Sequence, residues 1–128
     1  GFKPVNDTHG HEAGDRLLIE VARRLEAAVR AHDTVARLGG DEFVVLLTDL
    51  RVPREGVAAA ERIRAALAPP CMVADALAVA IRISLGLAFA PRHGGDAAAL
   101  LRAADRAMYR AKSRGRNQIC IAEDACLP

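Results

Sequence analysis

The sequence predicts an α/β fold in which helices flank a mixed central sheet. Helical and strand-like hydrophobic patterns alternate along the chain, and no linker, repeat or low-complexity segment interrupts them. The chain has 128 residues, of which 52% are hydrophobic, so it can bury a core of its own. We therefore expect residues 1–128 to form a single domain.

The first half of the chain predicts a helix, a hairpin and a second helix. Apolar residues recur at helical spacing from residue 15 to about residue 31. The stretches DTVARL and EFVVLLT predict two strands, and the glycine pair between them is typical of a hairpin turn. The second strand is an unbroken apolar run, so we expect residues 43–47 to be buried on both faces. Residues 54–68 predict a helix that two prolines end.

The second half predicts a strand, a helix and a last strand. Residues 79–89 alternate between large apolar and mostly small side chains, as if another element packs closely on the small face. Residues 94–115 have helical spacing, with Leu101 among the side chains expected to face the core, and Gly115 can end this helix. The stretch NQICIAE predicts the final strand.

Composition excludes several classes of protein. A net charge of +2 argues against a general nucleic-acid binder. No apolar run approaches the roughly 18 residues of a membrane span, and no signal peptide is visible. Three cysteines without a CxxC pair suggest neither a zinc site nor a disulfide framework. We expect reduced thiols in a cytoplasmic domain, whether or not its parent protein is tethered to a membrane.

The stretch ARLGGDEFVVLL places Asp41 and Glu42 side by side, directly before an apolar run. Most acidic turns of this kind are simply solvated. Neighbouring carboxylates repel each other, however, and their desolvation is costly unless a cation compensates. Two acids on a tight hairpin suit a hard cation with oxygen ligands, most simply Mg²⁺. Gly39 and Gly40 would also let a bulky ligand approach the backbone.

Asn6 and Asp15 bracket a glycine-containing turn before the first long helix. Taken alone, Asp15 is explained by the preference for acids in the first helical turn, and Asn6 is an ordinary turn residue. Taken together, the carboxylate can accept from the two N–H groups on the Watson–Crick edge of guanine, with the amide beside it. Adenine offers no such pair of donors.

Two other charged pairs also have two interpretations. Lys112 and Arg116 lie one turn apart at a helix end, where they either complement the helix dipole or clamp a phosphate. Arg30 and Asp33 lie three residues apart before the hairpin, where a local ion pair of little energetic value explains them.

Four stretches together resemble the GGDEF family of diguanylate cyclases: FKPVNDTHGHEAGD, ARLGGDEFVVLL, ISLGLAFAP and LLRAADRAMYRAKSRGRN. They recur in the family's order and spacing from Phe2 to about Asn117, and the GGDEF motif is intact at Gly39 to Phe43. The resemblance implies the GGDEF fold, which is related to the polymerase palm and to class III nucleotide cyclases. It also implies that two GTP molecules are joined into cyclic di-GMP with release of pyrophosphate.

The resemblance gives the acidic hairpin a catalytic role. Glu42 would be a metal ligand, and Asp41 a second metal contact or the base for the attacking hydroxyl. Gly39 and Gly40 would lie against the nucleotide. The metal would be Mg²⁺, or Mn²⁺ in its place.

The same resemblance assigns the remaining charged residues to the substrate and the product. Asn6 and Asp15 would recognise guanine. Lys112 and Arg116 would hold the phosphates. The family's RxxD inhibitory site, which binds cyclic di-GMP, matches Arg30 and Asp33, and Arg62 would supply a second arginine.

The reaction also implies partners and a longer protein. One domain holds one GTP and two must face each other, so we expect a homodimer. The chain opens on GFKPVND without methionine, as a piece of a longer protein would, and an N-terminal sensor or regulatory domain is expected in the parent. The family's first core strand, with its D-x-D acid, would fall before Gly1, so we expect this chain to lack both. The alternative function is a non-catalytic module that binds cyclic di-GMP at the RxxD site; a purely structural dimerisation domain fits the residues less well.

Overall fold

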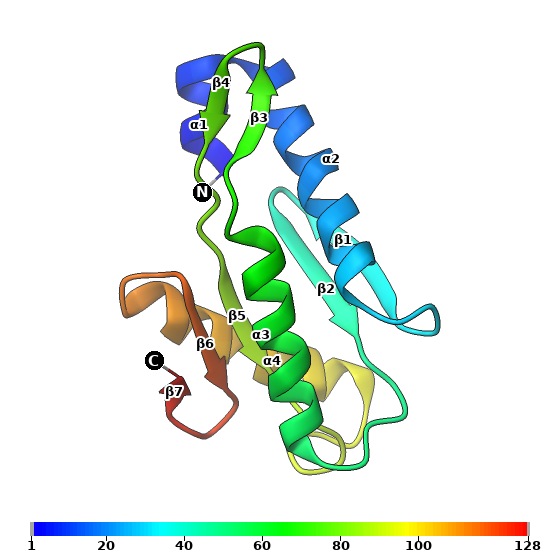
Figure 1. The fold of residues 1–128 in the computed structure, drawn as a ribbon. Helices are drawn as coiled ribbons and strands as arrows, with labels where there is room; N and C mark the ends of the chain where they lie inside the picture. Colours follow the sequence, from blue (N-terminus) through cyan, green and yellow to red (C-terminus); the bar gives the residue numbers. More distant parts are fainter. Residues whose placement is uncertain (1, 128) are drawn as a thin grey trace. The chain divides into compact units, whose positions relative to one another are not determined.

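A computed structural model describes residues 2–127, without the side chains of residues 2–4 and 7 (Figure 1). The elements are α1 (Phe2–His9), α2 (His11–Ala28), β1 (Thr34–Gly39), β2 (Glu42–Leu46), α3 (Pro53–Leu67), β3 (Cys71–Ala74), β4 (Leu77–Val79), β5 (Ser84–Leu87), α4 (Ala97–Ser113), β6 (Gln118–Ile121) and β7 (Cys126–Leu127). The predicted mixed α/β class is confirmed. Within these described residues, no helix combines the length and the apolarity that a membrane crossing requires.

The chain divides into two compact units, and the expectation of a single domain stays a prediction. One unit comprises Gly1–Arg51 and Glu61–Ile81, and the other Val52–Ala60 and Arg82–Pro128. The strands form three small sheets where the sequence predicted one central sheet. The strand expected over residues 79–89 is interrupted, because β4 ends at Val79 and β5 begins at Ser84. Consequently β4 pairs with β3 and β5 with β6.

In the first unit, α1 and α2 pack on each other and α2 packs on β3. Val5, Leu17 and Val73 belong to the buried cluster that these elements share. The turn expected between Asn6 and Asp15 is wrong, because residues 2–9 are helical and the helices break only at Gly10. Gly10 has a φ of 87°, which favours glycine, and its N–H donates to the Asn6 carbonyl at 2.9 Å.

Strands β1 and β2 form an antiparallel hairpin that is in register from Thr34 opposite Leu46 to Arg37 opposite Phe43. The register then shifts between Arg37 and Gly39, and Gly39 lies opposite Glu42. The expectation that residues 43–47 are buried on both faces is wrong. Most of these residues are half-buried, and Leu46 is 55% exposed. The reason is that β2 pairs with β1 alone among the strands that the structure describes.

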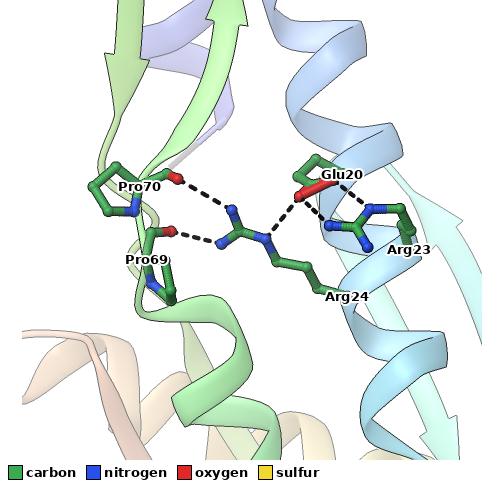
Figure 2. A network of polar contacts seen from close by, with 5 residues as sticks. All are labelled: Glu20, Arg23, Arg24, Pro69 and Pro70. Carbon is green, nitrogen blue, oxygen red and sulfur yellow. Dashed lines mark hydrogen bonds and ion pairs between the residues drawn. The ribbon is translucent and has the colours of Figure 1, made fainter.

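A network of polar contacts connects α2 to the segment that follows α3 (Figure 2). The guanidinium of Arg24 donates from Nη1 to the Pro69 carbonyl at 2.6 Å and from Nη2 to the Pro70 carbonyl at 3.1 Å. Its Nε donates to the Glu20 carboxylate at 2.8 Å, which also accepts two hydrogen bonds from Arg23. Hydrogen bonds from Arg23, then from Arg24, lower the pKa of Glu20 from 4.5 to about 2.

In the second unit, α4 packs on the parallel pair β5–β6. A Cβ atom at Gly86 would lie 2.0 Å from the Ala104 carbonyl oxygen and 2.4 Å from the Met108 nitrogen, so the strand and the helix backbone nearly touch. This confirms the expected close packing on the small-residue face. Leu101, which we expected to face the core, is 43% exposed, because the buried face of α4 is formed by alanines: Ala103, Ala107 and Ala111.

The expectation of three reduced thiols is wrong for two of the cysteines. Cys120 and Cys126 form a disulfide, whereas Cys71 is free and buried. The physical reason is the strand β7, which the sequence pattern did not predict. It folds back antiparallel to β6 and places Cys126 directly opposite Cys120.

The close approach of β5 and α4 at Gly86 predicts that a larger residue there destabilises the fold. Gly86→Ala should lower the free energy of unfolding by roughly 2–3 kcal/mol, because the new methyl group meets backbone atoms that cannot move aside. Urea unfolding measures this change. Gly95→Ala is the matched control, since a Cβ there meets no heavy atom within 4 Å and should cost little. Equal stability of the two variants would contradict the packing described here.

The Glu20 network predicts a pH dependence of stability. The pKa of Glu20 is lowered in the fold, so its ionised form stabilises the protein above pH 4.5, and this contribution is lost as the pH falls toward 2. The difference in unfolding free energy between wild type and Glu20→Gln should therefore shrink across that window, as measured by urea unfolding. Glu12→Gln is the control, because the Glu12 carboxylate is 88% exposed and 3.8 Å from Arg16. A difference that stays constant with pH would contradict the network.

Candidate functional site

The hairpin tip presents Asp41 and Glu42 to solvent. Both residues are exposed, and they follow Gly39 and Gly40, whose φ angles of 148° and 51° form the turn. A Cβ atom at either glycine would meet no heavy atom within 4 Å, so the space over this backbone is open to a ligand. Arg37, which the sequence pattern did not single out, stabilises the turn, because its Nε donates to the Gly40 carbonyl at 2.8 Å. Its position three residues before Gly40 is the only sequence signal.

The donor chemistry of this tip fits a magnesium ion that arrives with a nucleotide. Within the part of the chain that the structure describes, no group of three or more His, Cys, Asp or Glu residues could enclose a metal. Mg²⁺, however, is commonly bound by one or two carboxylates together with substrate phosphates and waters. Asp41 and Glu42 supply two such carboxylates at one turn, and their exposure leaves room for the phosphates.

Asn6 and Asp15 lie on α1 and α2, two helices that pack together. Asp15 is exposed and lies beyond the first turn of α2, where Glu12 is the acidic residue, so the helix-dipole explanation does not account for it. The Oδ1 atom of Asn6 is buried and has no hydrogen-bond partner among the described residues. Such an atom is costly unless a donor reaches it, which favours a ligand.

Lys112 and Arg116 lie at the end of α4 in the second unit. Lys112 is half-buried in the last helical turn, and Arg116 is exposed beyond it. The expected spacing of one helical turn is wrong, because Gly115 and Arg116 have φ angles of 99° and 66° and bend the chain out of the helix. The Arg116 N–H then donates to the Ala111 carbonyl at 3.0 Å.

Arg30 and Asp33 line a common groove of about 380 Å³. The expected ion pair between their side chains is replaced by backbone contacts: Asp33 Oδ2 accepts from the Arg30 N–H at 2.9 Å, and Oδ1 from the Thr48 N–H at 3.1 Å. Burial raises the pKa of Asp33, but these two hydrogen bonds, together with the nearby charges of His32 and Arg30, lower the pKa overall. Arg62 is exposed on α3 and is not among the described residues that line the groove.

Comparison with known proteins places these motifs in a family. Residues 1–118 match the family described as "Diguanylate cyclase, GGDEF domain". The bifunctional diguanylate cyclase/cyclic di-GMP phosphodiesterase MucR of Pseudomonas aeruginosa is 46% identical over 125 residues, which are 98% of this chain and 18% of MucR. This chain also spans 28% of the diguanylate cyclase TpbB of the same species, so both relatives are much longer proteins.

Solved structures agree with the sequence match. The GGDEF domain of TpbB from Pseudomonas aeruginosa superposes with a TM-score of 0.92 at 42% identity, over 95% of this chain and 71% of that one. The GGDEF domain of DgcB from Caulobacter crescentus, in complex with c-di-GMP, gives a TM-score of 0.78 at 28% identity, over 96% of this chain and 72% of that one. This chain therefore belongs to the GGDEF domain family of diguanylate cyclases.

Proposed function

We propose that this chain is the catalytic domain of a diguanylate cyclase that condenses two GTP molecules into cyclic di-GMP and releases pyrophosphate. The observation that carries the proposal is the intact GGDEF motif on an exposed hairpin tip, with open space over both glycines. The family match and the relatives named as diguanylate cyclases support it.

In this reaction the glycines and the acidic residues of the hairpin turn have different roles. The 3′-oxygen of each GTP attacks the α-phosphorus of the other, and at each phosphorus the bond to the pyrophosphate oxygen breaks, so that two phosphodiester bonds form and two pyrophosphates leave. The proton of the attacking hydroxyl is taken up by Asp41, unless that carboxylate is a second metal contact. Glu42 holds the cation, and bound Mg²⁺ or Mn²⁺ stabilises the charge that develops on the phosphoryl oxygens. The backbone of Gly39 and Gly40 lies against the nucleotide.

Guanine and the phosphates are held by the remaining residues. The exposed Asp15 carboxylate accepts from the two N–H groups of the guanine edge, and the Asn6 amide oxygen, which has no partner among the described residues, accepts a further hydrogen bond. Lys112 and Arg116 supply positive charge for the phosphates. Since each chain holds one GTP, the active species is a symmetric homodimer in which the two nucleotides face each other.

A second function, binding of cyclic di-GMP without turnover, is favoured by the groove that Arg30 and Asp33 share. A related GGDEF domain, that of DgcB, has been solved in complex with c-di-GMP. In an active cyclase this groove would be the inhibitory product site, with Arg62 as an additional contact. In the longer parent protein, a sensor or regulatory domain would control either function.

The metal-ligand role of Glu42 predicts the outcome of its isosteric substitution. Glu42→Gln should reduce the rate of cyclic di-GMP and pyrophosphate release from GTP and Mg²⁺ by at least about 100-fold, because a neutral amide binds Mg²⁺ poorly. Chromatographic product analysis measures both products. Asp49→Asn is the control: this carboxylate is 83% exposed, and its neutralisation should leave the rate nearly unchanged.

Two results would count against the cyclase proposal. One is a Glu42→Gln variant as fast as the wild type. The other is a dimeric wild-type protein that binds cyclic di-GMP in calorimetry but releases no product from Mg·GTP, which would favour the binding module.

The role of Asp15 predicts a change in base selectivity. Inosine triphosphate lacks the 2-amino group, so the wild type should use it less efficiently than GTP. Asp15→Asn should lower kcat/KM for GTP by about tenfold or more and narrow the preference for GTP over inosine triphosphate, since the amide cannot accept both hydrogen bonds. The control Glu12→Gln, one turn earlier on α2, should keep the preference. An unchanged ratio in Asp15→Asn would remove this residue from the base site.

A further inference from the structure

Asp33 lies where the two ends of the β1–β2 hairpin meet. It directly precedes β1, and Thr48 follows β2 by two residues. The Asp33 side chain is only 2% exposed, and its two oxygens accept from two different parts of the chain: the Thr48 N–H, and the Arg30 N–H in the turn that follows α2. The Asp33 N–H also donates to the Arg30 carbonyl at 3.0 Å, which closes that turn.

We propose that Asp33 is a positioning residue for the catalytic hairpin. Its carboxylate joins the turn after α2 to the outgoing end of β2, and so fixes the open end of the hairpin whose tip carries Asp41 and Glu42. This inference rests on the proposed function for the role of the tip, but the carboxylate contacts exist independently of it.

Such a closure matters because the hairpin is only partly packed: α2 contacts β1, and most residues of β2 are half-buried. A two-stranded hairpin is marginal in water by itself. No residue of β1 or β2 is fully buried, and Leu38 and Leu46 are 62% and 55% exposed. The tip is fixed by the glycine turn and by Arg37, whereas the open end is fixed by two charge-assisted hydrogen bonds to Asp33, which are stronger than neutral ones.

This role separates Asp33 from Arg30. Arg30 donates to Asp33 through its backbone N–H, whereas its guanidinium acts on the Asp33 carboxylate only as a nearby positive charge and lines the groove, where it can serve a ligand. Asp33 contributes through its side chain. The lowered pKa of Asp33 agrees with a carboxylate that is kept ionised by two backbone donors. Substitutions at the two positions should therefore have different consequences.

Amide hydrogen exchange followed by NMR tests the closure directly. In the wild type the Arg30 and Thr48 amides should be protected. In Asp33→Asn at least one of them should exchange about tenfold faster or more, because the amide group cannot accept both hydrogen bonds. Arg30→Ala should keep both amides protected, and Asp49→Asn, the neighbouring exposed acid, is the matched control. Asp33→Ser, which keeps one acceptor, is a second variant if Asp33→Asn fails to fold.

The Mg²⁺ dependence of turnover tests the effect on the tip. Loss of folded protein would lower the maximal rate at an unchanged half-saturating Mg²⁺ concentration. Loss of positioning should raise that concentration in Asp33→Asn by about threefold or more and leave it unchanged in Asp49→Asn.

Three outcomes decide the inference. Equal exchange at Arg30 and Thr48 in wild type and Asp33→Asn would overturn it. The inference would also be overturned if Asp33→Asn lost product inhibition but kept the amide exchange rates and the Mg²⁺ dependence of the wild type. In that case Asp33 would only bind the product. If the wild type itself turns over no GTP, the proposed function fails, and the exchange comparison still decides whether Asp33 closes the hairpin.

Discussion

The β1–β2 hairpin has to hold two like charges side by side on a tip with almost no buried surface of its own. Asp41 and Glu42 avoid a desolvation cost by staying in water, where their repulsion is screened. Their geometry is then set by the turn rather than by packing. The tip is shaped by Gly39 and Gly40, which have left-handed φ angles, and by the contact from Arg37. The open end of the hairpin is held by the Asp33 carboxylate. A tip built this way leaves the space over Gly39 and Gly40 open to a ligand.

A different constraint governs the end of α4, which carries Lys112 and Arg116. There the helix lies so close to β5 that only Gly86 and a row of alanines fit between the backbones. Close backbone packing holds this helix against β5, and the helix ends at Ser113, directly before Arg114 and the left-handed Gly115. The basic pair is thus presented by a rigid helix end, whereas the acidic pair is presented by a lightly packed hairpin. The acidic pair and the basic pair therefore differ in how much their positions depend on single hydrogen bonds.

The sequence predicted those features of the fold that depend on a few neighbouring residues, such as turns and helix ends. The paired glycines predicted the hairpin, the alternation around Gly86 predicted a close-packed face, and Gly115 predicted the end of α4. Features that depend on tertiary context were not predictable. The apolar run 43–47 indicated burial, but burial depends on which strands lie beside it. Cys126 faces Cys120 only because β7 folds back on β6. The sequence suggested an ion pair between Asp33 and Arg30, because the hydrogen bond that Asp33 accepts from the Thr48 N–H joins residues at opposite ends of the hairpin.

The central claim is that the acidic tip and the α1–α2 region serve one guanine nucleotide and its metal. A crystal structure of the dimeric protein with Mg²⁺ and a non-hydrolysable GTP analogue tests it most directly. We expect Glu42 to lie in the coordination sphere of the ion and the purine edge to lie within hydrogen-bond distance of Asp15. A nucleotide bound with Glu42 turned away from the ion, or with the purine far from Asp15, would contradict it.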